Sequence, residues 1–310
     1  MHCIRPIKVS QTFDGTLTYK QKSAIPGLVG WQLPCRKCLP CRLKIGREKA
    51  IRAYHESKMH EDNIFLTLTY NDDHCPPRLL YEHWQTFIKD LRDRVGYSPD
   101  VRISTMVTGE YGDKSKRPHW HALIFNFRPH DQPVKPFRET DFGPVYRSPF
   151  LQELWGMGNT EYGSVTMDSA SYVGRYAAKK LSHGNDQDHD YHPIHKTSSK
   201  NALGKSWIEK YWKQTLNHGY VTLPNGAKAS IPRYYLDWAK KNRPSAYETY
   251  VTQTLPQIMH DAELRARKEE IDFFTYSMNP QGTVWPLDRS LVKHTVLKQK
   301  FKKLQEHLKL

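Results

Sequence analysis

The sequence predicts an α+β fold, in which helices pack on an antiparallel sheet over about residues 61–182. Two observations predict it. Stretches in which apolar residues alternate with Thr, typical of strands, are interspersed with stretches whose apolar residues recur at helical spacing. Their order along the chain is strand, helix, strand, strand, helix, strand and helix. This order favours an antiparallel sheet with the helices layered on it.

The elements of this core are expected in the following order. We predict a strand at 64–70, a helix at 79–95, strands at 101–111 and 118–125, a partly helical stretch at 140–155, a strand at 162–167, and a helix at 170–181 with Asp168 and Ser169 as its N-cap. The helix at 79–95 has an apolar stripe that includes Trp84, Phe87 and Leu91. We expect this stripe to lie in the core.

Three further parts flank the core. We expect a cysteine-rich element with a basic helix at 1–60, a basic, aromatic-rich extension at 183–250, and a helical C-terminal tail at 251–310. Residues 1–34 look irregular or short-stranded, and the His- and Asp-rich stretch 182–199 is interpreted as a solvated loop. The aromatic residues of 201–250 suit either stacking on single-stranded DNA or a small packed core.

The charge of the chain indicates a polyanionic partner. The formal net charge is +15 over 310 residues. A basic protein of the membrane surface is the competing interpretation, but no apolar run approaches the roughly 18 residues of a membrane span. The N-terminal residues lack the apolar segment of a secretory signal. We therefore expect a soluble intracellular protein.

The cysteines suggest a structural metal site. Cys35, Cys38 and Cys41 stand at two overlapping Cys-x-x-Cys spacings, from which three thiolates can reach one Zn²⁺. Cys3 is the expected fourth ligand, because an N-terminal segment can fold back onto this knuckle; Cys75 or a histidine is the alternative. Free thiols, or a redox pair with a spare thiol, would give the same spacing.

A second possible metal site lies in the two central strands. His119 and His121 are two residues apart in one strand, so they point to the same face while Trp120 points to the other. A hairpin with the preceding strand would bring Glu110 near them. Two imidazoles and a carboxylate suit a divalent cation, Mg²⁺ or Mn²⁺. A purely structural histidine pair would show the same pattern.

The helix after the last strand carries a possible nucleophile. Tyr172, Arg175, Tyr176 and Lys179 share one face at i, i+3, i+4 and i+7. A tyrosine can attack phosphorus if its proton is removed and the phosphate charge is neutralised by a metal or a nearby cation. Tyrosines stacked for helix stability are the alternative. A separate face, suited to packing on the sheet, holds Ala170, Val173, Ala177 and Leu181.

At this point a family resemblance becomes specific. The strand at 65–70, the His119-Trp120-His121 motif and the Tyr-x-x-x-Tyr-x-x-Lys helix at 172–179 resemble, in that order, the motifs of the two-tyrosine HUH endonucleases of rolling-circle replication. The chain is most similar to the replication initiators of gokushovirus-like microviruses of bacteria. Trp120 departs from the usual aliphatic residue between the histidines. Also matching, within about residues 1–240, are Cys3, the 35–41 knuckle, 109–112, 204–211 and 232–235.

The resemblance implies a ferredoxin-like HUH core and a metal-dependent DNA nickase and strand transferase. By carry-over, His119 and His121 bind Mg²⁺ or Mn²⁺, with Glu110 as third ligand. Tyr172 or Tyr176 attacks the scissile phosphate, leaving a 5′-phosphotyrosine link and a free 3′-OH. The other tyrosine later attacks the regenerated origin, and the freed 3′-OH closes the circle without ATP.

Two cations complete the implied catalytic set. Lys179 would position the phenolate or the phosphate, and Arg175 would do so for the first tyrosine. The implied substrate is single-stranded DNA at the origin of a circular viral genome, copied with a host helicase and polymerase in the cytoplasm of the bacterial host. The alternatives are a non-catalytic, zinc-stabilised protein that binds or packages single-stranded DNA, and a plasmid- or transposon-type HUH nuclease.

Overall fold

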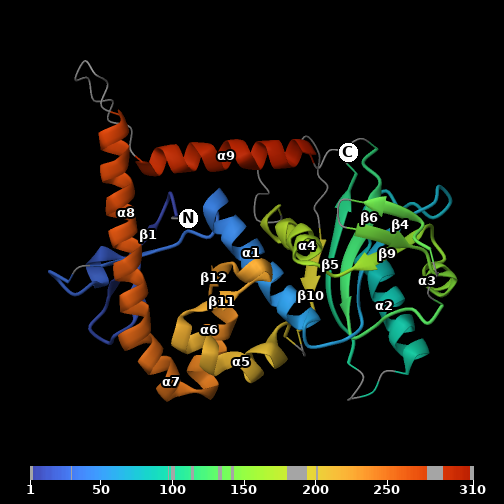
Figure 1. The fold of residues 1–310 in the computed structure, drawn as a ribbon, viewed down its shortest axis with the longest axis horizontal. Helices are drawn as coiled ribbons and strands as arrows, with labels where there is room; N and C mark the ends of the chain where they lie inside the picture. The colour runs from blue at the N-terminus through green and yellow to red at the C-terminus, as the bar shows by residue number, and fades with distance from the viewer. Residues whose placement is uncertain are drawn as a thin grey trace. The chain divides into compact units, whose positions relative to one another are not determined.

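The computed structural model describes residues 3–28, 30–96, 98, 102–112, 115–131, 135–140, 143–179, 194–199, 202–277 and 289–307. The chain divides into two compact units, Met1–Trp207 and Ile208–Leu310 (Figure 1). The finer division into four parts stays a prediction.

A seven-stranded sheet forms the centre of the first unit. Its strand order is β10-β5-β6-β4-β9-β8-β7, and neighbouring strands run antiparallel throughout. The predicted α+β fold with a central antiparallel sheet is therefore confirmed. The strands are β4 (Asn63–Thr69), β5 (Ser104–Tyr111), β6 (Pro118–Phe125), β7 (Arg138–Thr140), β8 (Gly143–Tyr146), β9 (Thr160–Ser164) and β10 (Ile194–Thr197).

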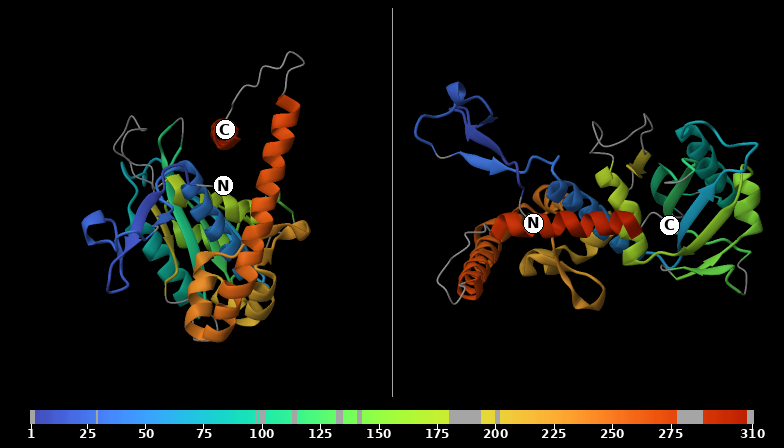
Figure 2. Two further views of the ribbon diagram at one scale, coloured as in Figure 1. Left: turned by 90° about the vertical axis from the view of Figure 1, so that its left-hand side faces the viewer. Right: turned by 90° about the horizontal axis from the view of Figure 1, so that it is seen from above.

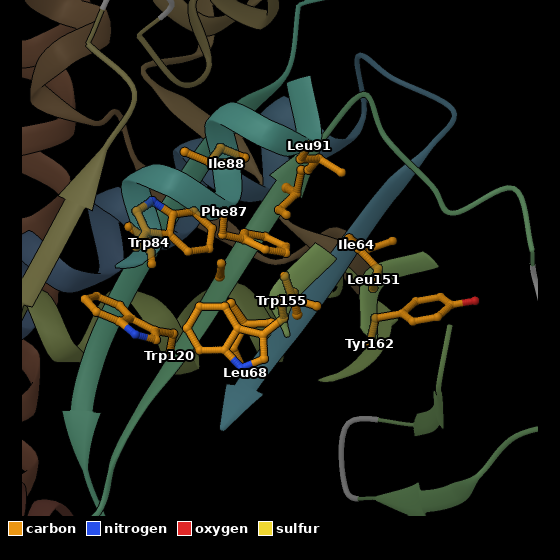
Figure 3. Close-up of a cluster of buried hydrophobic side chains, with 14 of the residues drawn as sticks. Ile64, Leu68, Trp84, Phe87, Ile88, Leu91, Trp120, Leu151, Trp155 and Tyr162 are labelled. Atoms are coloured by element: carbon orange, nitrogen blue, oxygen red, sulfur yellow. The ribbon is translucent and has the colours of Figure 1, made fainter. Parts of the chain in front are cut away.

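Helices cover both faces of this sheet. On one face, α2 (Tyr81–Val95) and α3 (Pro149–Trp155) pack on alternate residues of β4 and β6, including the fully buried Trp120. Figure 3 shows Trp84, Phe87 and Leu91 of α2 directed at the sheet, as the apolar stripe predicted. On the other face, α1 (Leu39–Ser57) and α4 (Met167–Lys179) pack on the intervening residues of the same strands. The period of two in the strands thus separates two apolar layers.

Two expectations about the outer strands were wrong. The stretch 140–155 is helical only from Pro149; before it, β7 and β8 form a hairpin at the sheet edge. The stretch 182–199 is not all loop, because β10 pairs with β5 and His195 is buried. Both strands are short and polar, so pairing with a neighbour, not apolar alternation, decides their conformation. The rest of that stretch, 182–193, lies outside the described residues.

The N-terminal segment forms a small sheet of its own, in the order β2-β1-β3 (Figure 2). Its strands are β1 (Ile7–Gln11), β2 (Leu17–Thr18) and β3 (Trp31–Leu33), with a 3₁₀ turn at Gln21–Ser23. The stretch is therefore short-stranded, one of the two expected possibilities. Cys3 precedes β1, and Cys35 follows β3.

The segment before α5 (Lys205–His218) is held on α1. Nε of Arg52 donates to the carbonyl of Leu203 at 2.9 Å, and a carboxylate oxygen of Glu56 accepts from the backbone N–H of Gly204 at 2.7 Å. Trp207 stacks on the buried His55 ring with a centroid distance of 3.7 Å. Trp207 thus packs against the first unit, which favours the packing alternative for this residue.

The second unit is mostly helical, with one small hairpin. Tyr235 and Ala239 are fully buried, so this region also has a packed interior. No described helix has the length and apolar character needed to cross a bilayer. Its elements are β11 (Tyr220–Thr222), a 3₁₀ turn (Pro224–Gly226), β12 (Lys228–Ser230), α6 (Arg233–Asn242), α7 (Pro244–Thr249), a π-helical turn (Tyr250–Thr254), α8 (Leu255–Ser277) and α9 (Arg289–His307).

Candidate metal centre

The β5–β6 hairpin brings the three predicted ligands together. In its register Glu110 lies opposite His119, and Thr108 lies opposite His121. Paired residues of antiparallel strands point to the same face. Glu110, His119 and His121 therefore project together from the face that α1 and α4 cover, while Trp120 projects into the opposite layer. The predicted hairpin and the predicted facing of both histidines are confirmed.

The ligand atoms of the three residues converge. Oε1 of Glu110 lies 3.1 Å from Nε2 of His119 and 3.2 Å from Nε2 of His121. One ligand atom from each residue lies within 4.8 Å of the other two. Glu110 is 7% exposed and His121 is 9% exposed, so the group is almost closed to water. This geometry is compatible with one bound divalent cation.

Both histidines are oriented by contacts at their other ring nitrogen. Nδ1 of His119 lies 3.2 Å from the carbonyl oxygen of Arg117, which can only accept, so Nδ1 carries a proton. Nδ1 of His121 lies 3.0 Å from the hydroxyl of Thr67, the residue opposite it on β4. Each Nε2 is thereby directed at the shared centre. Such outer contacts set the tautomer and ring orientation of metal-ligating histidines.

The electrostatics keep the ligands in the forms that a cation needs. Burial of the Glu110 carboxyl alone would raise its pKa, but hydrogen bonds and charge from His119 and His121 together hold the pKa well below its usual range. Burial lowers the pKa of His121, against the opposing influence of Glu110. At neutral pH the centre therefore contains an ionised carboxylate and a neutral His121 imidazole. Deprotonated ligands are the ones that bind metals.

Tyr172 reaches this centre from α4. Its hydroxyl donates a hydrogen bond to Oε1 of Glu110 at 3.1 Å and lies 3.4 Å from Nε2 of His121. The Tyr172 ring meets the His121 ring edge-on, with centroids 5.1 Å apart. Phe65 of β4 packs against both rings, at centroid distances of 6.2 and 5.8 Å. The tyrosine oxygen thus shares its nearest neighbours with the possible cation.

A close helix crossing positions α4. A Cβ on Gly46 of α1 would lie 2.8 Å from the carbonyl oxygen of Gly174 on α4, and a Cβ on Gly174 would lie 2.8 Å from that of Gly46. No larger residue fits at either position without movement of the backbone. Ala170 and Val173 are fully buried beside this crossing, as predicted for the packing face.

The start of α4 corrects the predicted N-cap. The helix begins at Met167, three residues before the predicted start at Ala170. Oγ of Ser169 accepts from the Thr166 N–H at 2.8 Å, and the Thr166 hydroxyl accepts from the Ser169 N–H at 3.1 Å. This reciprocal pattern is a capping box with Thr166 as the N-cap. Asp168 lies in the first turn, where a carboxylate complements the helix dipole.

The remaining residues of the predicted nucleophile face are placed only in part. Nε of Arg175 donates to the Ser171 carbonyl of its own helix at 3.1 Å. Tyr176 and Lys179 belong to α4, but their side chains lie outside the described residues. Their roles, and those of Tyr172 and Arg175, stay predictions.

Sequence reasoning missed Thr67 and Gly109. Thr67 was seen as part of a strand, and its contact with His121 becomes visible only through the β4–β6 register. Gly109 lies opposite Trp120, and a Cβ there would lie 2.6 Å from the indole ring. The small residue beside Glu110 makes room for the unusual Trp120. The available signal was the coincidence of a glycine in a strand with a bulky residue between the histidines.

The predicted cysteine group also comes together. The sulfur atoms of Cys3, Cys35, Cys38 and Cys41 all lie within 4.8 Å of one another, and all four residues are free thiols. The backbone N–H of Cys35 donates to Sγ of Cys3 at 3.2 Å. Cys75 is not part of this group, so the first choice for the fourth position is the one that the fold supports.

The thiols of this group differ in acidity. Burial raises the pKa of the Cys41 thiol to about 12, with help from Cys38. Burial also opposes ionisation of Cys35, but backbone N–H groups of Cys38 and Lys37 outweigh it and lower the pKa to about 6. Backbone N–H groups directed at sulfur stabilise a thiolate, which is the form that binds metals. Four converging sulfurs with such donors are compatible with a structural tetrahedral metal site.

Comparison with known proteins identifies the family. The family model for the replication-associated protein ORF2 matches residues 63–181. Replication-associated protein VP4 of Bdellovibrio phage phiMH2K is 55% identical over 317 aligned positions, which cover all of both chains. The chain belongs to the replication-associated proteins of microviruses. The family resemblance seen in the sequence is therefore confirmed.

More distant relatives agree. Replication-associated protein ORF4 of Chlamydia phage 1 is 36% identical over 67% of this replication-associated protein and 54% of the relative. Replication-associated protein ORF2 of Spiroplasma virus 4 is 29% identical over 78% of this chain and 86% of the relative. No solved structure matches the chain. The family model spans β4 to α4 and thus contains Glu110, both histidines and Tyr172.

Proposed function

We propose that this replication-associated protein initiates rolling-circle replication by nicking origin DNA with a tyrosine. The observation that carries the proposal is the 3.1 Å hydrogen bond from the Tyr172 hydroxyl to Glu110, within a Glu/His/His group. A nucleophile and a possible cation site share one almost buried pocket wall. Membership of a replication family supplies the DNA substrate, and the charge of +15 suits it.

The residues present fit a bound Mg²⁺ or Mn²⁺. Oε1 of Glu110 and the two Nε2 atoms would hold it, because both Nδ1 atoms already have other partners. When bound, the cation would neutralise phosphate charge and orient the scissile phosphodiester. The almost buried setting strengthens this electrostatic effect relative to water.

Tyr172 would supply the nucleophile. Its hydroxyl already donates to a carboxylate whose pKa is low, so the hydroxyl is fixed in orientation before the substrate binds. Loss of its proton and attack on phosphorus form a phosphotyrosine bond to the 5′ side. The phosphorus–oxygen bond to the 3′ side breaks, and the leaving oxygen takes up a proton to become the free 3′-OH.

Rejoining would use the second tyrosine. Tyr176 stands one helical turn after Tyr172 on α4, a spacing that lets the two alternate at one site. Attack by Tyr176 on the regenerated origin frees a new 3′-OH, which displaces the first tyrosine and closes the circle. Lys179 and Arg175 would balance phenolate or phosphate charge. The phosphotyrosine bond conserves the bond energy, so no ATP is needed.

The surroundings follow from this role. We propose that the four cysteines hold a structural Zn²⁺, that the substrate is single-stranded origin DNA of a circular viral genome, and that a host helicase and polymerase extend the 3′-OH in the bacterial cytoplasm. The phage relatives argue against a plasmid- or transposon-type nuclease. The remaining alternative is a non-catalytic protein that binds or packages single-stranded DNA.

One experiment separates catalysis from simple binding. The full chain is incubated with single-stranded origin DNA and Mn²⁺ or Mg²⁺, and the products are separated on a denaturing gel. We expect a covalent protein–DNA adduct that disappears in the Tyr172→Phe/Tyr176→Phe double variant. Absence of any adduct, or an adduct that survives in the double variant, contradicts the proposal.

A second variant tests the metal ligands. His119→Ala should abolish the adduct but leave salt-dependent DNA binding nearly unchanged, because that binding comes mainly from Lys and Arg contacts to phosphates. The measurement is the affinity for single-stranded DNA at several salt concentrations. Equal losses of adduct and of DNA affinity would instead place His119 in DNA binding.

A further inference from the structure

The small N-terminal sheet leaves an apolar face exposed. Register pairs Ile7 with Leu33, Val9 with Trp31 and Gln11 with Leu17, and paired residues point to one face. Of these, only Val9 is buried, at 2% exposed. The exposed fractions of the others are 41% for Ile7, 55% for Leu17, 47% for Trp31 and 36% for Leu33. A face of this kind usually has a partner.

Aromatic rings are concentrated in and beside this sheet. Residues 3–38 contain three aromatic residues, and each is exposed: Phe13 at 82%, Tyr19 at 70% and Trp31 at 47%. Such rings are costly to leave in water, because each offers a large apolar surface. Phe13 lies in the turn between β1 and β2, and Tyr19 directly follows β2. The three rings come from the turn, the edge and the opposite strand of one ribbon.

The same segment is strongly basic, which decides between possible partners. Asp14 is the single acid between residues 3 and 38, and its carboxylate accepts from the hydroxyls of Thr12 and Thr16 within its own turn. A second copy of the chain would place like charges together. An anionic partner with flat apolar groups fits better. The cations of the segment, all exposed, are Arg5, Lys8, Lys20, Lys22, Arg36 and Lys37.

We propose that the ribbon β1–β3 binds single-stranded DNA by stacking bases on Phe13, Tyr19 and Trp31, with its lysines contacting phosphates. Stacking on aromatic side chains along a positively charged path is how proteins hold single strands without reading their sequence. This inference rests on the proposed function only in taking DNA as the substrate.

The base of the ribbon connects it to the candidate metal centre. Cys3 and Cys35 lie at the two ends of the ribbon, and their contact closes it onto the start of α1. Gly46, within that helix, contacts Gly174 of α4, the helix that carries Tyr172. A strand held by the ribbon would thus be attached, through one helix, to the element that bears the nucleophile.

The test measures binding of the full chain to a fluorescein-labelled oligothymidylate of about 20 nucleotides. Alanine at Phe13, Tyr19 or Trp31 should each weaken binding about fivefold or more, without changing the salt dependence. Lys20→Gln with Lys22→Gln should reduce the slope of log affinity against log salt by about 0.7 for each lost phosphate contact. Phe137→Ala is the matched control, since Phe137 is 51% exposed outside the ribbon and should bind normally.

Two outcomes overturn the inference. One is a triple aromatic variant that binds the oligonucleotide as tightly as the unaltered chain. The other is a triple variant that changes the oligomeric state in light scattering while DNA affinity stays the same, which would make the face an interface between copies.

Crosslinking keeps the inference testable if the triple variant unfolds. The unaltered chain is irradiated with a 5-iodouracil oligonucleotide, and crosslinked peptides are expected at Phe13, Tyr19 or Trp31. Crosslinks confined to other segments overturn the inference. The adduct assay reports separately on nicking: an adduct with unchanged DNA affinity in the aromatic variants refutes the ribbon alone, and weakened affinity without any adduct in the unaltered chain refutes nicking alone.

Discussion

Gly46 and Gly174 touch where α1 crosses α4, each so close to the other's carbonyl oxygen that a Cβ would lie 2.8 Å from it. The crossing sets the distance of α4 from the sheet, and Tyr172 on α4 reaches Glu110 with a 3.1 Å hydrogen bond. Glycine in a helix interior costs about 1 kcal/mol relative to alanine, so its presence at both positions indicates a packing requirement.

Gly174→Ala should therefore destabilise the protein, although the same change in an exposed helix would stabilise it. We expect the free energy of unfolding to fall by about 1–3 kcal/mol, because the new methyl group overpacks the crossing. Adduct formation should fall further, since α4 must shift and take Tyr172 with it. Denaturant unfolding and the adduct assay measure the two effects. Ser171→Ala on the same helix is the control, and a Gly174→Ala chain as stable as the Ser171→Ala chain would contradict the prediction.

Thr67→Val tests the support of His121. The substitution keeps the shape of the side chain but removes the hydroxyl that lies 3.0 Å from Nδ1 of His121. Affinity for Mn²⁺ should fall about 10- to 100-fold, as for other residues that orient a metal-ligating histidine. Calorimetric titration of Mn²⁺ measures it. Thr69→Val, two residues along the same strand, should bind Mn²⁺ normally; equal losses in both variants would point to a general effect on β4.

Tyr70→Phe tests how Trp120 is accommodated. The Tyr70 hydroxyl accepts from the indole N–H of the fully buried Trp120 at 2.9 Å and contacts Nδ1 of His83 at 3.0 Å. Burial raises the pKa of Tyr70 to about 12, so the hydroxyl stays protonated at neutral pH. Its removal leaves the indole N–H unpaired and should lower the free energy of unfolding by about 1–3 kcal/mol. Denaturant unfolding measures this, and an unchanged midpoint would contradict it.

Cys3→Ser tests the cysteine group as a metal site. Protein purified without added zinc should contain about one zinc per chain, and the variant should bind it more weakly and unfold at lower temperature. Metal analysis and thermal unfolding give the two readouts. Cys75→Ser is the matched control, because Cys75 lies outside the group and should leave zinc content unchanged. Less than half an equivalent of zinc in the unaltered chain would contradict the site.

Sequence periodicity by itself determined the central features of the site. The period of two in a strand placed His119 and His121 on one face and Trp120 on the other, and the short connection to the preceding strand brought Glu110 beside them. These are local consequences of backbone geometry, so no distant contact was needed to predict them. The cysteine knuckle was likewise local, and its spacing held three of its four members.

Only the tertiary structure decided the contacts between distant segments. It selected Cys3 over Cys75 as the fourth cysteine, gave Thr67 its contact with His121, and brought the Tyr172 hydroxyl to Glu110. It also made 194–197 a strand, through pairing with β5. Each of these depends on which strands and helices become neighbours, a choice set by burial over the whole unit. The local pattern of Thr67 or of 194–197 carries no record of that choice.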